Sequence, residues 1–195
     1  SRVAELVKAL TESKDLVCVE GLGGIGKTTL ALLTVHHPEI VQRFDDLIWI
    51  NAVAGTSELS IVETIFETLS IQPPTSVTEA KASLTALRQL RALIVVDDIN
   101  ALDIDLFVGL FAPAVGASRI LLLSRRRIDH PHTMSFRVGE LPLKASLALI
   151  RQEARRRGES LDSVRDKALM PLYDIVGGNP LACLLYTSDA ADDLV

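Results

Sequence analysis

The chain has 195 residues, 48% of them hydrophobic, and a formal net charge of −5 at pH 7. This length and hydrophobic content suffice for a well-buried core and exclude a largely disordered protein. The negative charge argues against a general basic surface, so we expect no direct nucleic-acid partner. The two cysteines, Cys18 and Cys183, have no CxxC or His-rich neighbours. They favour a reducing, cytoplasmic setting over disulfides or a zinc site.

Apolar runs are short throughout the chain. The longest, such as residues 93–96 and 120–123, fall far below the roughly 20 residues that span a bilayer. No signal-peptide pattern opens the sequence. We therefore expect no membrane association.

Helical patterns and short apolar runs alternate along the first 139 residues. Helices are expected at residues 1–10, 26–37, 59–69 and 79–90, and strands at 16–19, 47–50, 93–96, 119–123 and 134–138. Such alternation predicts a parallel sheet between two layers of helices, a three-layer α/β fold. From residue 140 the strands stop, and two helical patterns, 144–157 and 164–176, predict a partial helical lid over residues 140–182.

A glycine-rich segment follows the first expected strand. Residues 21–28 read GLGGIGKT and match the GxxxxGK[ST] pattern between a buried strand and a helix. Glycines let backbone N–H groups converge on phosphates, and the helix adds the positive end of its dipole. Lys27 is predicted to reach the β- and γ-phosphates, and the Thr28 hydroxyl to ligate Mg²⁺. The predicted nucleotide contacts in this region are Gly21, Gly23, Gly24, Ile25, Gly26, Lys27, Thr28 and Thr29.

Two carboxylates end the apolar run at residues 93–96. Mg²⁺ prefers hard oxygen ligands and accepts a single carboxylate, so Asp97 is predicted to enter the metal shell. Asp98 is placed to orient or deprotonate an attacking water. Glu often holds that role and reaches further, so we expect weak ATP hydrolysis. A simple helix cap after the strand is the alternative for this pair.

The run at residues 119–123 leads to three consecutive arginines. Because the carboxyl ends of parallel strands meet at one edge of the sheet, a guanidinium there could bind the γ-phosphate in a bidentate way. Arg125 is the predicted sensor. Arg126 and Arg127 are expected to be solvated.

The ordered set of segments resembles the NB-ARC and wider STAND family of signal-transduction ATPases. The similar segments are Arg2 to Leu6, the phosphate loop through Ala31, residues 44–50, 93–98 and 118–125, and the GNPLA sequence at 178–182. The family's GLPLA motif implies that Pro180 contacts the base and sugar, and its entry motif implies a nucleotide contact for Arg2, although Ser1 stands in the Gly place. The resemblance also implies the strand order 2-3-1-4-5.

In function, the resemblance implies a switch controlled by ATP and ADP, with self-association of the full-length ATP-bound parent protein. The chain stops before the winged-helix region in which the family carries a further ADP contact.

Residues 183–193 resemble the in-frame translation of a common sequencing-library transposase adapter. We therefore expect residues 183–195 to be a non-native tail and assign no function to them.

Three other functions remain open at this point. A P-loop small-molecule kinase would need an acceptor pocket with its own base, and the sequence after Asp98 offers no convincing candidate. A nucleic-acid motor would show ATPase activity stimulated by DNA or RNA. A scaffold would bind nucleotide without turnover.

Overall fold

The computed structural model describes residues 1–114 and 116–193, with side chains described as far as residue 187. Its contacts divide the chain into two compact units. The first comprises Ser1–Gly21 and Lys27–Arg137, and the second comprises Leu22–Gly26 and Val138–Val195. The expected tail, residues 183–195, extends beyond the described residues.

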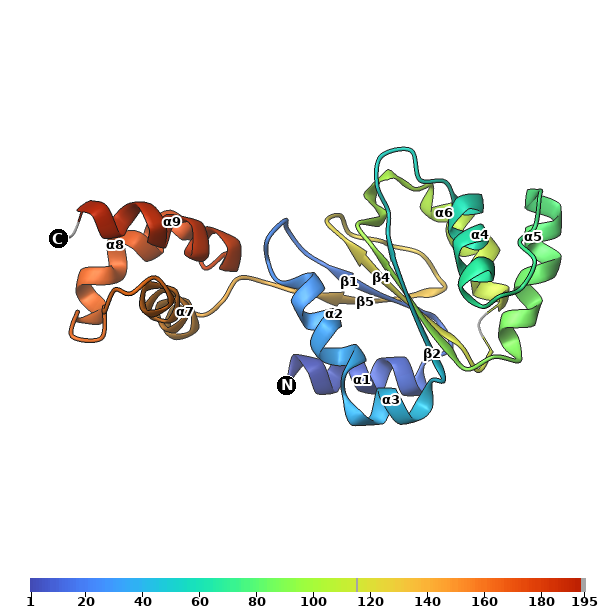
Figure 1. The fold of residues 1–195 in the computed structure, drawn as a ribbon, viewed down its shortest axis with the longest axis horizontal. Helices are drawn as coiled ribbons and strands as arrows, with labels where there is room; N and C mark the ends of the chain where they lie inside the picture. Colours follow the sequence, from blue (N-terminus) through green and yellow to red (C-terminus); the bar gives the residue numbers. More distant parts are fainter. Residues whose placement is uncertain (115, 194–195) are drawn as a thin grey trace. The chain divides into compact units, whose positions relative to one another are not determined.

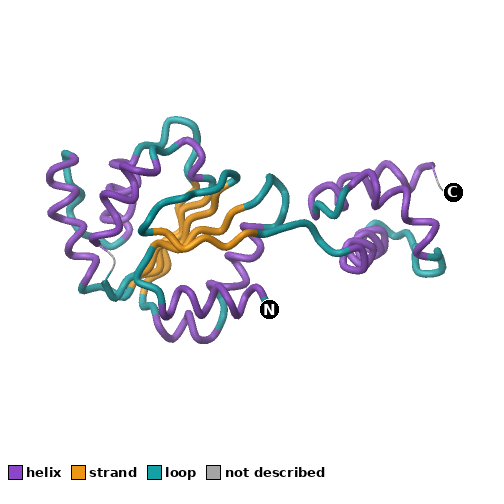
Figure 2. Tube along the Cα trace, turned by 180° about the vertical axis from the view of Figure 1, so that it is seen from behind, coloured by secondary structure: helices purple, strands orange, loops and turns teal. Residues whose placement is uncertain are grey.

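A five-stranded parallel sheet forms the centre of the first unit (Figure 2). Its strands are β1 (Leu16–Glu20), β2 (Asp46–Asn51), β3 (Ala92–Asp97), β4 (Arg119–Ser124) and β5 (Thr133–Arg137). Every residue of β1 and β4 is buried, whereas β2 and β5 leave residues exposed. Continuous apolar runs suit strands that are covered on both faces, so the predicted α/β sheet is confirmed.

The predicted strand order 2-3-1-4-5 is wrong. The observed order is β2-β3-β4-β1-β5, with Leu121 of β4 paired to Val95 on one side and to Val17 on the other. The fifth strand contains Thr133, Ser135 and Arg137 and occupies the edge beside β1. Local apolar patterns identify a central strand, but its neighbours depend on pairing between distant segments, which those patterns do not encode.

Helices cover both faces of this sheet (Figure 1). One layer contains α1 (Arg2–Glu12), α2 (Lys27–Val35) and α3 (Pro38–Arg43); the other contains α4 (Glu58–Thr68), α5 (Val77–Leu84) and α6 (Ile104–Phe111). Short 3-10 segments lie at Thr85–Arg88, Ile99–Ala101 and Ala112–Ala114. The expected helix at 79–90 therefore ends early as a 3-10 turn, and α3 and α6 were not predicted.

Local sequence explains where several of these helices begin. The Ser1 hydroxyl accepts a hydrogen bond from the Ala4 amide at the start of α1. Ser57 and Ser60 form a reciprocal capping box at the start of α4. Such caps satisfy amides that have no partner within the helix.

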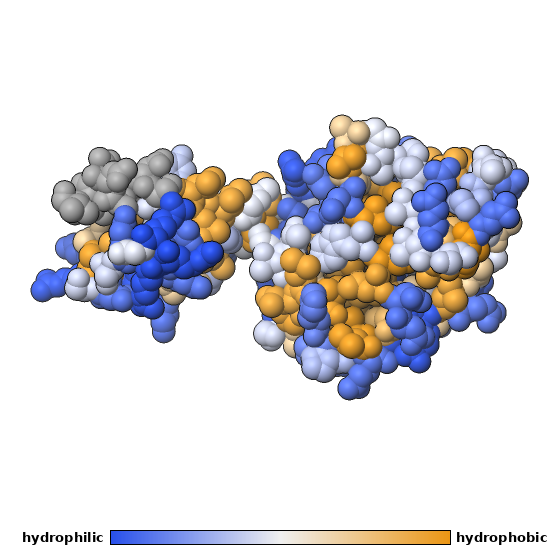
Figure 3. Space-filling model, in the orientation of Figure 1, coloured by the Kyte–Doolittle hydropathy of each residue, from blue (hydrophilic) through white to orange (hydrophobic). Residues whose placement is uncertain are grey.

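The larger core lies between the sheet and α4 to α6. It includes Ile94 and Val96 of β3, Ile65 of α4, and the stacked rings of Phe107 and Phe111, whose centroids are 4.3 Å apart. On the face that carries α1 to α3, apolar surface remains exposed (Figure 3). The exposed apolar side chains of α2 and α3 are Leu32, Leu33 and Val41.

Three helices make up most of the second unit: α7 (Leu143–Arg156), α8 (Asp166–Val176) and α9 (Pro180–Asp193). They pack around Leu147, Ile150, Leu169, Val176 and Cys183. Gly177 ends α8 in the left-handed conformation, which glycine adopts without steric cost.

Among the residues that the structure describes, no single helix is long and apolar enough to cross a membrane. One sharply bent pair, Asp166–Val176 with Pro180–Thr187, meets the length and composition requirement only when taken together.

We predict that Phe111→Ala lowers the free energy of unfolding by about 3–5 kcal/mol, because it removes a fully buried ring and leaves a cavity. Leu106→Ala is the matched control, since Leu106 lies on the same helix with 42% of its surface exposed. Chemical denaturation should show a loss of less than about 1 kcal/mol for the control. Equal losses would contradict this account of the core.

Candidate functional site

In the first unit, parallel pairing brings the carboxyl ends of β1, β4 and β3 to one edge of the sheet. Glu20 at the end of β1 pairs with Ser124 at the end of β4, and the Gly21 amide donates to the Ser124 carbonyl over 3.1 Å. Asp97 ends β3 on the other side of β4. Polar groups from three strands therefore lie at this edge, where α/β proteins bind ligands.

Lys27 begins α2 with its side chain largely buried. Its Nζ donates a hydrogen bond to the Gly21 carbonyl over 2.8 Å. Burial lowers the pKa of Lys27 and the nearby Arg125 charge lowers it further, while Asp97 and Asp98 act in the opposite direction. An additional anion beside Lys27 would stabilise its charged form.

Thr28 and Asp97 are in direct contact. The Thr28 hydroxyl donates to Oδ2 of Asp97 over 2.9 Å, although β4 separates β3 from β1 in the sheet. Among the described residues, no group of three or more His, Cys, Asp or Glu side chains could hold a metal ion. One hydroxyl and one carboxylate nevertheless suit Mg²⁺, which takes its remaining ligands from water and substrate phosphates.

Asp98 is paired with Arg125. The Arg125 Nη2 lies 2.8 Å from Oδ2 of Asp98, and the side-chain amide of Asn100 donates to Oδ1 of Asp98. Asp98 has φ +59° and ψ +48°, a left-handed conformation that Asp and Asn tolerate better than most residues. The structure thus brings together the two side chains predicted to activate water and to sense the γ-phosphate.

Asn100 was not predicted as a site residue. Its Oδ1 accepts hydrogen bonds from the Arg125 amide over 2.9 Å and from the Ser124 hydroxyl over 3.3 Å. Its carbonyl accepts from Arg126 over 2.8 Å. Asn100 therefore connects the segment after β3 to the segment after β4. An Asn two residues beyond an acidic pair was the available signal, since Asn often bonds to nearby backbone.

Glu20 was also missed. This buried carboxylate accepts hydrogen bonds from the Ile128 amide over 2.7 Å and the Ser135 hydroxyl over 2.6 Å, so it anchors the segment that carries the three arginines. Burial raises the pKa of the Cys18 thiol well above its ordinary value, and the Glu20 charge raises it further. The sequence feature that could have identified Glu20 was a single carboxylate at the end of an apolar strand.

Arg126 and Arg127 are exposed, as predicted. Arg127 pairs with Asp129 at 3.6 Å. Arg2 lies on α1, where its guanidinium pairs with Glu5 at 3.5 Å, and none of its described contacts involves the residues at the sheet edge.

The second unit contains the loop Leu22–Gly26 and the segment that begins α9. The Asn179 side-chain amide donates to the Gly23 carbonyl over 3.0 Å, and the Leu181 amide donates to the Gly24 carbonyl over 3.2 Å. Pro180 is the first residue of α9. These bonds join the two loop carbonyls to the segment that resembles the family's GLPLA motif.

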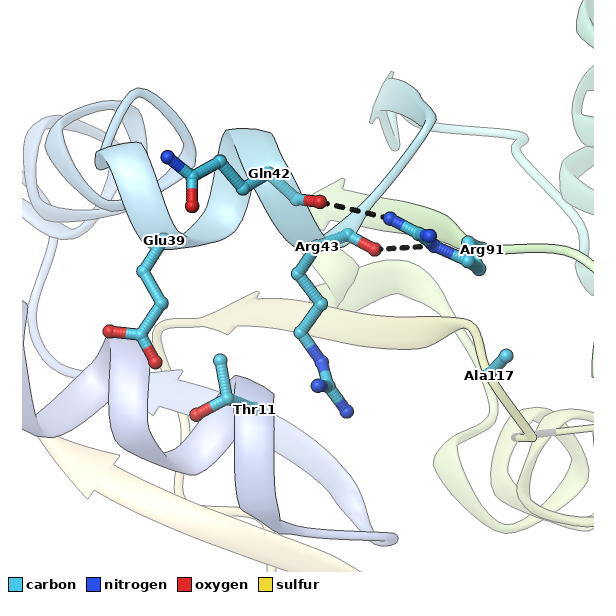
Figure 4. A pocket seen from close by; sticks show the side chains of 6 residues that line it. All are labelled: Thr11, Glu39, Gln42, Arg43, Arg91 and Ala117. Carbon is cyan, nitrogen blue, oxygen red and sulfur yellow. Dashed lines mark hydrogen bonds between the residues drawn. The ribbon is translucent and has the colours of Figure 1, made fainter.

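A cavity of about 460 Å³ lies at the opposite edge of the sheet, by the strand beginnings (Figure 4). Arg91 borders it and donates to the carbonyls of Arg43 and Gln42 over 2.8 and 2.9 Å. These bonds satisfy carbonyls at the end of α3. The cavity lies away from the phosphate-loop edge, so we do not assign it to the same site.

The NB-ARC domain family matches residues 1–145 of this chain. The sequence is 33% identical over 135 residues to a probable disease resistance protein of Arabidopsis thaliana, covering 64% of this chain and 15% of that protein. It is 29% identical over 192 residues to disease resistance RPP8-like protein 3 of the same plant, covering 92% and 21%. The chain thus spans about a fifth or less of these two relatives.

The fold is shared with solved crystal structures, of which two examples follow. A STAND protein with a tetratricopeptide repeat sensor from Pyrococcus horikoshii matches with a TM-score of 0.65 and 16% identity, covering 91% of this chain and 28% of the other. Cdc6p from Pyrobaculum aerophilum matches with a TM-score of 0.64 and 15% identity, covering 98% and 61%.

We predict that Gly24→Ala destabilises the second unit by about 1–3 kcal/mol. Gly24 has φ +73°, and an added Cβ would lie 2.6 Å from Cβ of Leu181. Gly23→Ala is the control, because a Cβ there meets nothing within 4 Å and its φ lies outside the left-handed range. Hydrogen exchange of the loop and α9 amides should rise for the first variant only. Similar exchange in both variants would contradict the described contact.

Proposed function

This chain belongs to the NB-ARC family, and we propose that it is the nucleotide-binding switch domain of a larger STAND-type signalling ATPase. The observation that carries the proposal is the 2.9 Å hydrogen bond between Thr28 and Asp97. It joins the residue after the phosphate-loop lysine to the carboxylate that ends β3. Together these are the usual Mg²⁺-binding elements of a P-loop NTPase.

The proposed ligands are ATP and ADP with Mg²⁺. Lys27 would bind the β- and γ-phosphates, and Thr28 and Asp97 would hold the metal. Backbone N–H groups of the glycine-rich loop would bind the remaining phosphate oxygens, a task for which exposed amides at a helix start are suited. The proposed contacts in this region are Gly21, Gly23, Gly24, Ile25, Gly26 and Thr29. Pro180 and Arg2 are proposed contacts on the family resemblance.

The proposed reaction is slow hydrolysis of ATP. Asp98 would orient the attacking water, and Arg125 would bind the γ-phosphate. A group that contacts only the triphosphate gives ATP and ADP different affinities for two conformations, which is the requirement for a nucleotide switch. Hydrolysis would then return the active form to its resting form.

For the parent protein, we propose a cytoplasmic setting and self-association in the ATP-bound form. The curated relatives carry names of disease resistance proteins, which supports a role in signalling. We retain residues 1–139 as the nucleotide-binding domain, 140–182 as a partial lid and 183–195 as a non-native tail. No contact of the described residues favours a small-molecule kinase.

We predict that Lys27→Ala weakens Mg²⁺-ATP binding at least tenfold, equivalent to about 1.4 kcal/mol or more, because it removes the cation proposed to bind the β- and γ-phosphates. Lys8→Ala, on the exposed face of α1 and paired there with Glu12, is the control. Titration calorimetry with the purified chain measures both. Unchanged affinity in Lys27→Ala, or no nucleotide binding by the unaltered chain, would refute the proposed function.

We further predict that Asp98→Ala lowers the ATPase rate by about 100-fold, within the usual contribution of a general base, while ATP still binds. Phosphate release under single-turnover conditions measures the rate. Turnover equal to that of the unaltered chain would favour a scaffold that binds nucleotide without using Asp98.

A further inference from the structure

We propose that Arg125 serves two anions in turn: it holds the Asp98 carboxylate until a γ-phosphate takes its place, and this exchange releases Asp98 to act on water. The inference rests on the proposed function and adds a regulatory step to the same site. It links the proposed role of Asp98, orienting the attacking water, to the proposed role of Arg125, binding the γ-phosphate.

The first argument is occupancy. Oδ2 of Asp98 accepts from Arg125 Nη2 at 2.8 Å, and Oδ1 accepts from the Asn100 amide. Both oxygens of the carboxylate are thus directed at groups of the protein. Each oxygen keeps a further lone pair for a water, but the two bonds fix the direction of the carboxylate. Release of Arg125, the more exposed of the two donors, leaves the side chain free to turn toward a water beside the phosphate.

The second argument is mobility of the side chain over a fixed backbone. The Arg125 amide is held by Oδ1 of Asn100 at 2.9 Å, whereas the Arg125 side chain is 62% exposed. The guanidinium can therefore turn to a new partner without movement of β4 or of the segment that follows it.

The third argument is the balance of energies. An exposed ion pair has a median stabilisation of only about 0–1 kcal/mol, and the Asp98 side chain is 42% exposed. The Asp98 carboxylate accepts one hydrogen bond from this guanidinium, whereas a phosphate can accept two charge-assisted hydrogen bonds from it and carries more negative charge. We therefore expect the γ-phosphate to displace Asp98 from Arg125, whereas ADP, which lacks that group, leaves the Arg125–Asp98 ion pair intact.

The test compares affinities for Mg²⁺-ADP and for a non-hydrolysable Mg²⁺-ATP analogue, and the quantity measured is the ratio of the two dissociation constants. In the full chain, Asp98→Asn removes the competing charge and keeps a residue that tolerates the left-handed backbone. We expect it to raise the preference for the ATP analogue about two- to fivefold, the range that an exposed ion pair allows.

The same substitution is then made together with Arg125→Ala. If Asp98 competes for Arg125, the increase in preference for the ATP analogue becomes smaller once the arginine is absent. If Asp98 merely repels the γ-phosphate, the gain persists or grows, because no cation remains to offset the carboxylate. Arg125→Gln provides a second neutral background in case the alanine variant folds poorly.

Arg127→Ala is the matched control. It removes one positive charge from the same segment, and Arg127 pairs with Asp129 rather than with Asp98. The gain from Asp98→Asn should remain complete in this background. A gain that is independent of Arg125, or no gain while both nucleotides bind, overturns the exchange and leaves the proposed function standing. Failure of the unaltered chain to bind either nucleotide overturns both.

Discussion

Parallel pairing of β1, β4 and β3 is the constraint on which the candidate site depends. Parallel strands all end at the same edge of their sheet, so residues that follow three separate strands meet there although they are distant in the sequence. Two hydrogen bonds are consequences of that pairing. The Gly21 amide donates to the Ser124 carbonyl, and the Thr28 hydroxyl donates to Asp97. The buried strands supply rigidity, and the polar groups are confined to their ends.

Sequence reasoning proposed the parts of the candidate site that lie within one segment. The phosphate loop is a local pattern whose glycines and lysine have defined spacings. Asp97 directly follows a recognisable apolar run, and Arg125 lies two residues beyond another. The parallel sheet was predictable for the same reason, because alternation of strands and helices is visible locally.

What escaped prediction was the pairing order of the strands and the contacts of two further residues. The central position of β4 depends on which strands pair, and apolar runs of similar composition fit several orders. Asn100 and Glu20 draw their importance from groups that approach them only after folding: the Arg125 amide for Asn100 and the Ile128 amide for Glu20. A single Asn or Glu in a sequence gives no indication of such partners.

The left-handed backbone of Asp98 has a consequence for which residues this position accepts. A left-handed residue selects short side chains such as Asp and Asn, whose polar groups compensate locally for the steric cost. Glu would reach further toward a bound triphosphate but fits this backbone less well. If the proposed hydrolysis resets the switch, this main-chain conformation favours the shorter acid, and a shorter reach toward the attacking water would lengthen the lifetime of the active form.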